Sequence, residues 1–326
     1  MSSIQVAGHV CVDLAPRIGS AGVAVPGELA EVGPMCISIG GAVGNCGRVL
    51  AELGVDVSLS ASVGDDALGA LCLRLLRAHH GDAVELAVVR GLGTSYSVVV
   101  EPQGVDRSFW HHTGANDAFA GECAITARQL LHFGYPSLAP AMCTDHGAPI
   151  ARLFERAHSQ GVATSLDLAF LAANSPLQAL DWAALLQTVL PVCDIFCPSW
   201  DDLVSSLGVP PDAVGPLVAS WADTFVEWGA AVVLITLGQR GAFLRVANQS
   251  RLVTLGSCGI DPQAWAGTSM WMAPGMIDKV VTTNGAGDTY KAAFLAHLVQ
   301  GFSPDQCLGF AREIVARRLT GRPLVG

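Results

Sequence analysis

Short apolar runs that alternate with helix-like segments are the feature of this chain that most restricts its fold. The clearest run is residues 231–236, a continuous apolar stretch typical of a strand covered on both faces of a sheet. About eight strand–helix units of this kind follow one another along the chain. The alternation predicts the α/β class, with one doubly wound, mostly parallel sheet in a single domain over residues 1–326.

The bounds of the expected elements come from the apolar runs and from the glycine and polar residues beside them. The expected strands are residues 4–14, 57–64, 130–133, 163–168, 195–198 and 231–236, a strand that begins at Ile37, and a strand that follows a turn within residues 237–244. The expected helices are one that ends at Gly54 and those at residues 65–78, 123–129, 147–160, 178–190, 213–228, 287–300 and 304–319.

Residues 94–112 interrupt this alternation. Residues 94–100 and 107–110 have the pattern of two strands with no helix between them, which predicts a hairpin. A hairpin that projects from an α/β sheet can act as a lid. We therefore expect a small β lid built from about residues 14–37 and 93–112. Exposed lid strands could pair between two subunits, so a homodimer through the lid is possible.

The charge and cysteine content exclude several classes of protein. A formal net charge of −10, with Lys279 and Lys291 as the only lysines, argues against a broad face for nucleic acid or anionic lipid. No stretch reaches the ~18 apolar residues of a membrane span, and no signal peptide is evident. The ten scattered cysteines favour buried thiols in a reducing compartment, and their spacing is not typical of zinc sites. We expect a cytoplasmic protein.

A glycine-containing turn at residues 284–288, Asn-Gly-Ala-Gly-Asp, runs directly into a helix. Glycines let backbone N–H groups face one concavity, and the start of the helix adds the positive end of its dipole. Asp288 lies in the first helical turn. Such a pair suits phosphoryl transfer, because the concavity holds the phosphoryl group while the carboxylate takes a proton from the attacking hydroxyl. The alternative is a tight loop followed by a favourable first-turn acid.

A second candidate region lies near the N-terminus. Asp13 follows the first expected strand, and ligands of open α/β sheets bind at the carboxyl ends of strands. Its carboxylate could accept hydrogen bonds from substrate hydroxyls, or it could simply form a turn. Gly40 and Gly41 would let a ligand approach the backbone, and Asn45 lies one turn into the next helix. This segment is neither a Walker A loop nor a dinucleotide-binding GxGxxG motif.

Residues 40–45 with 64–69, and residues 284–288, resemble the two signatures of the ribokinase-like sugar kinases, the PfkB carbohydrate kinase family. Asp13, residues 114–116 and residues 236–241 add supporting matches, so the resemblance covers nearly the whole chain. It implies ATP-dependent transfer of a phosphoryl group to a hydroxymethyl group of a sugar or sugar-like small molecule. It also implies Mg²⁺ bridging the phosphates, mostly through water.

The resemblance assigns roles to individual residues. Asp288 is the general base. The anion hole is formed by Gly285, Ala286 and Gly287. The substrate-binding set is Asp13, Gly40, Gly41, Asn45 and Asn116, to which we add Arg107 of the lid, which could meet an anionic group or be a solvated charge. The nucleotide-binding set is Ser199, Thr236, Gly238, Gly241 and Asn284. Asp202 would support the metal through water.

Three departures from the family pattern bear on metal and substrate. Residues 199–202 read Ser-Trp-Asp-Asp where the family often has NxxE, so metal dependence is expected to be weaker or altered. Thr282 stands where an Asp is common, which puts activation by a monovalent cation in doubt. Tyr135 follows the strand where ribokinases carry an acid, which weakens ribose as the acceptor. A nucleoside kinase, or a catalytically weak sugar- or nucleotide-binding protein, stays open as an alternative.

General rules predict the positions of four further side chains. Lys291, one turn beyond Asp288, is expected on the helix surface. His111 and His112 are expected to be structural or solvent-facing. Trp271, in an apolar loop, is expected in the core.

Overall fold

The structure is a computed structural model that describes residues 3–19, 26–102, 107–212, 214–277 and 279–325. The strands of the main sheet are β1 (Ser3–Gly8), β4 (Asp56–Gly64), β5 (Val84–Val89), β8 (Leu130–Gly134), β9 (Ala163–Asp167), β10 (Ile195–Phe196), β11 (Val232–Thr236), β12 (Ala242–Val246) and β13 (Ser269–Met272). Their order is β13-β12-β11-β10-β9-β8-β1-β4-β5. From β11 to β5 all neighbours are parallel, whereas β12 and β13 are antiparallel additions at one edge.

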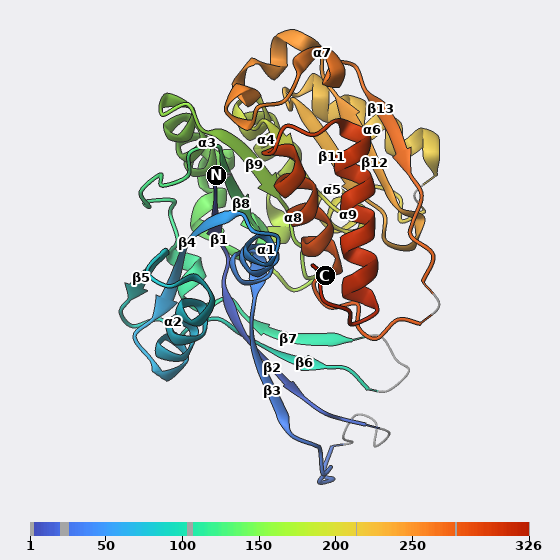
Figure 1. The fold of residues 1–326 in the computed structure, drawn as a ribbon. Coiled ribbons are helices and arrows are strands. Elements are labelled where there is room, and N and C mark those ends of the chain that lie inside the picture. The colour runs from blue at the N-terminus through green and yellow to red at the C-terminus, as the bar shows by residue number, and fades with distance from the viewer. Residues whose placement is uncertain (1–2, 20–25, 103–106, 213, 278, 326) are drawn as a thin grey trace.

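Helices cover both faces of this sheet (Figure 1). The α-helices are α1 (Gly41–Glu52), α2 (Ala67–His80), α3 (Thr144–Ser159), α4 (Trp182–Val189), α5 (Trp200–Leu207), α6 (Gly215–Glu227), α7 (Pro262–Trp265), α8 (Ala286–Leu298) and α9 (Pro304–Leu319). The 3₁₀ helices are η1 (Gly114–Ala118), η2 (Pro136–Leu138), η3 (Pro140–Cys143), η4 (Pro176–Ala179), η5 (Leu190–Val192), η6 (Gly238–Arg240) and η7 (Gln249–Cys258).

Two hydrophobic clusters form the core, one on each face of the main sheet. Strand β11 shows how one apolar run supplies both, because successive side chains of a strand point to opposite faces. Val232 and Leu234 belong to the cluster under α1, α2, α8 and α9. Val233 and Ile235 belong to the cluster under α3, α4, α5 and α6. The doubly wound, mostly parallel arrangement expected from the sequence is therefore confirmed.

A second, four-stranded sheet projects from one end of the main sheet (Figure 1). It consists of β2 (Cys11–Pro16), β3 (Met35–Gly40), β6 (Tyr96–Val100) and β7 (Ser108–His112), in the order β3-β2-β6-β7. The expected hairpin of residues 94–112 is the antiparallel pair β6–β7. We call this second sheet the lid sheet. Parts of the expected lid, residues 20–25 and 103–106, lie outside the described residues.

Two expected elements differ in the structure. The single strand at residues 4–14 is wrong: the chain turns after Gly8, whose φ is +120°, so β1 joins the main sheet and β2 joins the lid sheet. The helix at residues 123–129 is also wrong, since this segment is irregular. The backbone groups of this segment bond to the Gln5 side chain rather than to one another in a helix. Gln5 Nε2 donates to Ala124 O at 2.7 Å, and Thr126 N donates to Gln5 Oε1 at 2.9 Å.

Strands β5 and β13 were not expected, and β13 corrects the placement of Trp271. Because β13 is the edge strand of the main sheet, the Trp271 side chain is not in the core but 47% exposed. One face of its ring packs on Phe243, with the ring centroids 4.6 Å apart. The expectation of buried thiols is confirmed for the cysteines other than Cys36, which is exposed. Within the described residues, no helix combines the length and apolar character that crossing a bilayer requires.

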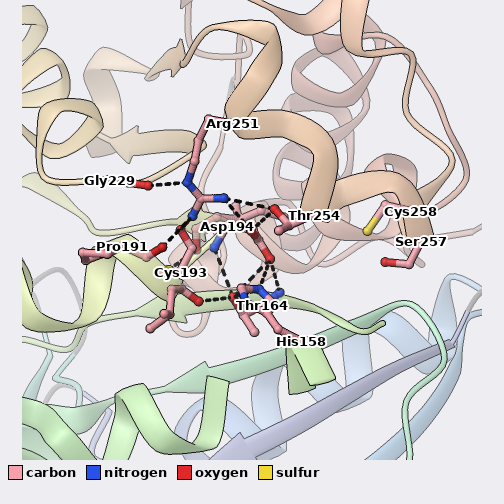
Figure 2. Close-up of polar contacts among 12 residues, drawn as sticks. His158, Thr164, Pro191, Cys193, Asp194, Gly229, Arg251, Thr254, Ser257 and Cys258 are labelled. Atoms are coloured by element: carbon pink, nitrogen blue, oxygen red, sulfur yellow. Dashed lines mark hydrogen bonds and ion pairs between the residues drawn. The ribbon is translucent and has the colours of Figure 1, made fainter. Parts of the chain in front are cut away.

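A buried polar network ties η7 to the start of β10 (Figure 2). Its centre is the fully buried Asp194, whose Oδ2 contacts His158 Nε2 at 2.7 Å and whose Oδ1 accepts from Arg251 Nη1 at 3.0 Å. Burial alone would raise the pKa of the Asp194 carboxyl, but the bonds from His158 and Thr254 and the Arg251 charge hold it below its usual value. The stabilisation is therefore present above the unfolded pKa of about 3.9 and is lost as the pH falls through the folded pKa.

We expect Thr254→Val to lower the free energy of unfolding by about 1–2 kcal/mol, because the Thr254 hydroxyl donates to Asp194 Oδ1 in this network. Urea unfolding at neutral pH measures the change. The matched control is Thr188→Val, since the Thr188 hydroxyl is exposed and bonds only to its own helix, through Ala184 O. The control should shift by less than about 0.5 kcal/mol. Equal shifts in the two variants would contradict a stabilising role for the network.

Candidate active site

A cavity of about 770 Å³ lies between the lid sheet and the carboxyl end of the main sheet. This volume is in the range of small-molecule sites, about 300–1,000 Å³. Among the residues predicted for the site, those that line it are Asp13, Gly41, Asn45, Arg107, Ser199, Asp202, Asn284, Gly285, Ala286, Gly287 and Asp288. The carboxylates of Asp13 in the lid sheet and Asp288 in α8 therefore face the same cavity, although they are 275 positions apart in the sequence.

The lid sheet turns a polar face to this cavity. Asp13 of β2 pairs with Ser97 of β6, and Ser97 pairs with His111 of β7, so these side chains form one row across the sheet. All three line the cavity. The next row of the same strands contains Val98 paired with Trp110, which face the opposite side because side chains alternate along a strand. The polar row therefore forms the lid wall of the cavity.

The start of α8 forms the opposite wall. Gly285 is the residue before the helix and has φ +71°, a conformation that glycine adopts without steric cost. The first N–H groups of any helix lack intrahelical partners, which makes this end suitable for an anion. One of the three expected anion-hole amides is engaged, since Ala286 N donates to Thr283 O at 3.2 Å.

Asp288 is buried, with both carboxylate oxygens hydrogen-bonded. Asn45 Nδ2 donates to Oδ2 at 2.8 Å, and Tyr135 Oη donates to Oδ1 at 2.5 Å. These two contacts come from α1 and from the turn after β8, so two separate elements fix the orientation of the carboxylate. Tyr135 itself has the left-handed φ of +70°, which is uncommon for a residue other than glycine. Sequence reasoning missed this role of Tyr135.

Gly40 and Gly41 make room for side chains of this chain. A Cβ atom on Gly40 would lie 2.3 Å from Asp13 Oδ2, and a Cβ atom on Gly41 would lie 2.5 Å from His9 Nδ1. Gly41 also has φ +76°. The glycines are thus required for the lid strand β2 to approach the start of α1 closely, which sets the position of the Asp13 carboxylate.

Lys291 was expected on the surface of the helix, but the structure corrects this expectation. The side chain lies in α8 and is only 4% exposed. Its Nζ atom lies 2.5 Å from Asp167 Oδ1, at the end of β9. Burial alone would lower the pKa of Lys291, but the carboxylates of Asp167, Asp202 and Asp288 raise it above its usual value. The ammonium therefore stays charged, and it lines the cavity.

Ser199 and Asp202 form a capping box at the start of α5. Asp202 N donates to Ser199 Oγ at 3.1 Å, and Ser199 N donates to Asp202 Oδ2 at 2.8 Å. This arrangement satisfies two backbone N–H groups of the helix start. It gives Ser and Asp at these positions a structural reason, while both residues still line the cavity. Burial raises the pKa of the Asp202 carboxyl.

Five predicted site residues do not line the cavity. Thr236 ends β11, and Gly238 and Gly241 lie in the turn that follows, where Leu237 N donates to Gly241 O at 2.8 Å. Thr236 adjoins the cavity through its bridge with Ser199.

The other two predicted site residues outside the cavity lining are Asn116 and Gly40. Asn116 is fully buried, and Gly40 lies against the Asp13 carboxylate. The Asn116 amide donates to Val10 O at 2.9 Å and to Thr113 O at 3.0 Å. The placement of Asn116 therefore corrects the expectation that it contacts substrate: it holds the turn between β1 and β2.

Arg107 connects the lid sheet to the loop before α8. Its Nη1 atom donates to Thr283 Oγ1, and its guanidinium lies over the ring of Phe109, 5.6 Å from the centroid. The sequence leaves Arg107 open between contact with an anionic group and a solvated charge, and it does not predict the bond to Thr283. His111 and His112, expected to be structural or solvent-facing, both line the cavity.

Known proteins share the sequence pattern and the fold of this chain. A family model described as pfkB family carbohydrate kinase matches residues 1–317. The ATP-dependent 6-phosphofructokinase of Thermoanaerobacterium thermosaccharolyticum is 24% identical over 86% of this chain and 80% of that protein. The structure of Arabidopsis thaliana ribokinase complexed with ribose and ATP has a TM-score of 0.70 at 20% identity, covering 98% of this chain and 93% of that chain. The Methanocaldococcus jannaschii nucleoside kinase has a TM-score of 0.68 at 15% identity, covering 98% and 92%.

Proposed function

Because this chain belongs to the pfkB family of carbohydrate kinases, we propose that it transfers the γ-phosphoryl group of ATP to a hydroxymethyl group of a sugar or sugar-like alcohol. The observation that carries this proposal is the position of Asp288. Its carboxylate faces the same cavity as Asp13 and lies in the first turn of α8, where helix N–H groups favour an anion.

The site residues have complementary parts in the proposed reaction. Asp13 accepts hydrogen bonds from hydroxyls of the acceptor and orients it. Asp288 takes the proton of the attacking hydroxyl, and the amides of Gly285 and Gly287 stabilise charge on the transferred group, since Ala286 N donates to Thr283 O. The contact between Arg107 and Thr283 helps to exclude water, which would otherwise compete as acceptor.

ATP and Mg²⁺ fit the α8 side of this cavity. We propose that the nucleotide lies near Ser199, Thr236 and Asn284. Asp202 offers the oxygen ligand that Mg²⁺ prefers, most simply through water. Bound Mg²⁺ would supply positive charge that neutralises part of the charge of the phosphates. Lys291, charged and already inside the cavity wall, supplies a second, fixed positive charge at the same side.

The proposal is tested by incubating the purified protein with ATP, Mg²⁺ and a panel of sugars, sugar acids and nucleosides while ADP release is measured. At least one acceptor should raise ADP release well above the rate with ATP alone. If no acceptor in a wide panel does so, although calorimetry detects nucleotide binding, the protein is instead a catalytically weak binding protein.

A nucleoside is the second candidate acceptor, because two exposed aromatic rings line the cavity. Phe109 is 46% and Phe170 is 61% exposed, and flat rings suit a nucleobase. Thermal shift separates the two classes: adenosine and pseudouridine should stabilise a nucleoside kinase, whereas fructose, ribose and 2-keto-3-deoxygluconate should stabilise a sugar kinase.

We expect Tyr135→Phe to lower kcat by about 10-fold, because the phenol that holds Asp288 Oδ1 is lost while Asn45 still holds Oδ2. The ring and its stacking on His9 remain. Steady-state kinetics measure the effect, and the KM for ATP should change less than kcat. Tyr96→Phe in the lid is the control, and it should keep the parental kcat. An unchanged kcat in Tyr135→Phe would contradict a positioning role.

We also propose a homodimer through the outer face of the lid sheet. Ile37, Leu14, Val98 and Trp110 form one row across that face. Ile37 is 46% and Trp110 is 65% exposed, and β3 and β7 are edge strands. Trp110→Glu is therefore expected to convert a dimer to a monomer in light scattering, whereas Val253→Glu, 74% exposed on η7, should not. A parental protein that is monomeric at all concentrations would contradict the dimer.

The cytoplasmic location stays a prediction.

A further inference from the structure

Three side chains that commonly bind metals converge on the lid wall, at a point that the proposed reaction does not use. His9 lies in the turn between β1 and β2, Cys11 begins β2, and His111 belongs to β7. One donor atom from each lies within 4.8 Å of the other two. The Nε2 atoms of His9 and His111 are 3.2 Å apart. In a tetrahedral zinc site the donor atoms lie about 3.3–3.8 Å apart, so small side-chain movements would give this spacing.

Their surroundings favour the metal-binding form of the two histidines, whereas burial and the Asp13 carboxylate raise the pKa of the Cys11 thiol well above its usual value. His111 Nδ1 lies 2.9 Å from Ser97 Oγ, a contact that leaves Nε2 directed to the cluster. Burial, with a contribution from His111, lowers the pKa of His9 well below its usual range. Burial and the neighbouring His112 lower the pKa of His111 to about 4. Both imidazoles are therefore neutral at pH 7 and do not have to lose a proton to bind.

We propose that His9, Cys11 and His111 together bind one divalent transition-metal ion of the zinc class. Imidazole and thiolate ligands select Zn²⁺ and similar ions, whereas Mg²⁺ requires oxygen ligands. Binding converts the Cys11 thiol to a thiolate and releases one proton to solvent. This site is separate from the Mg²⁺ expected near Asp202, on the α8 side of the cavity.

The fourth position of the ion faces the cavity. Three protein ligands leave one tetrahedral position open, and all three side chains line the cavity. Asp13 is not part of the group, although its Oδ1 lies 3.3 Å from Cys11 Sγ. An oxygen atom of water, or of a small molecule in the cavity, would complete the coordination. A metal here would therefore lie beside the carboxylate that we assign to the acceptor.

Cobalt titration tests the site without reference to kinase activity. Protein freed of metal with EDTA and dialysed should bind one Co²⁺ per chain, with the visible bands of tetrahedral cobalt and a thiolate charge-transfer band. Zn²⁺ should then displace the cobalt. Cys11→Ser should lose the charge-transfer band and weaken binding by at least about 100-fold, and His111→Ala should weaken it similarly. Cys36→Ser, which alters the exposed cysteine on β3, should behave like the parent.

Any of the following outcomes would contradict the proposed metal site. The absence of tetrahedral bands, or an unchanged charge-transfer band in Cys11→Ser, would mean that the side chains serve only as a hydrogen-bonding wall. Cobalt binding that survives His111→Ala would place the ion on other histidines. Thermal unfolding checks that the variants are folded. If Cys11→Ser fails to fold, His111→Ala tests the same site, because His111 is an exposed residue of β7.

Discussion

Asp288→Asn is expected to lower kcat by about 10²–10⁴-fold, the usual contribution of a general base. Asparagine has nearly the shape of aspartate, but its amide cannot take the proton of the attacking hydroxyl. Asn45 and Tyr135 hold the side chain from two elements, so the exchange should leave the cavity in place. The measurement is ADP release at saturating ATP and acceptor, with ATP affinity followed by calorimetry. The affinity should change only a few-fold, because the α8 amides remain.

The chain offers a matched control for this exchange. Asp305 occupies the first turn of α9, as Asp288 does in α8, but it is exposed and does not line the cavity. Asp305→Asn should therefore keep the parental kcat. If Asp288→Asn turns over at the parental rate, the carboxylate is a first-turn residue without a part in proton transfer, and the proposed mechanism fails.

The parts of the site that the sequence predicts are those built from local backbone patterns. Residues 284–288 predict the glycine turn and the start of α8, because a short motif contains both the turn and the helix. The hairpin β6–β7 is likewise evident from two adjacent strands. The long apolar run of β11 predicts a strand buried on both faces, which its alternating contacts confirm.

The parts that the sequence does not predict depend on contacts between distant segments. Lys291 looks like a surface residue one turn past Asp288, but residues 288–296 of α8 are all buried. Such a helix has no polar face, and the Lys291 partner is 124 positions away in the sequence. Tyr135 reaches Asp288 across 153 positions, and His9 meets His111 across 102. Cysteine and histidine spacing therefore gives no sign of the proposed metal cluster.

Because Lys291 is buried and paired with Asp167, Lys291→Met is expected to lower the free energy of unfolding more than the other variants proposed for this protein. Breaking a buried ion pair by removing one partner costs about 3–5 kcal/mol, because the remaining charge has no compensation. Methionine approximates the length of lysine, so the loss reports the charge rather than a cavity. Asp167 would be left fully buried at the end of β9, with Asp202 and Asp288 nearby. Urea unfolding at neutral pH measures the change in the free energy of unfolding.

Two further variants decide whether the ion pair is the cause. Lys279→Met changes the other lysine of the chain, which is exposed, and should shift stability by less than about 0.5 kcal/mol. Asp167→Asn in the Lys291→Met background removes the uncompensated carboxylate and should recover part of the loss, as a coupled pair requires. If the double variant is no more stable than Lys291→Met, the buried carboxylate is not the source of the loss. The ammonium would then act on the fold through Asp202 or Asp288.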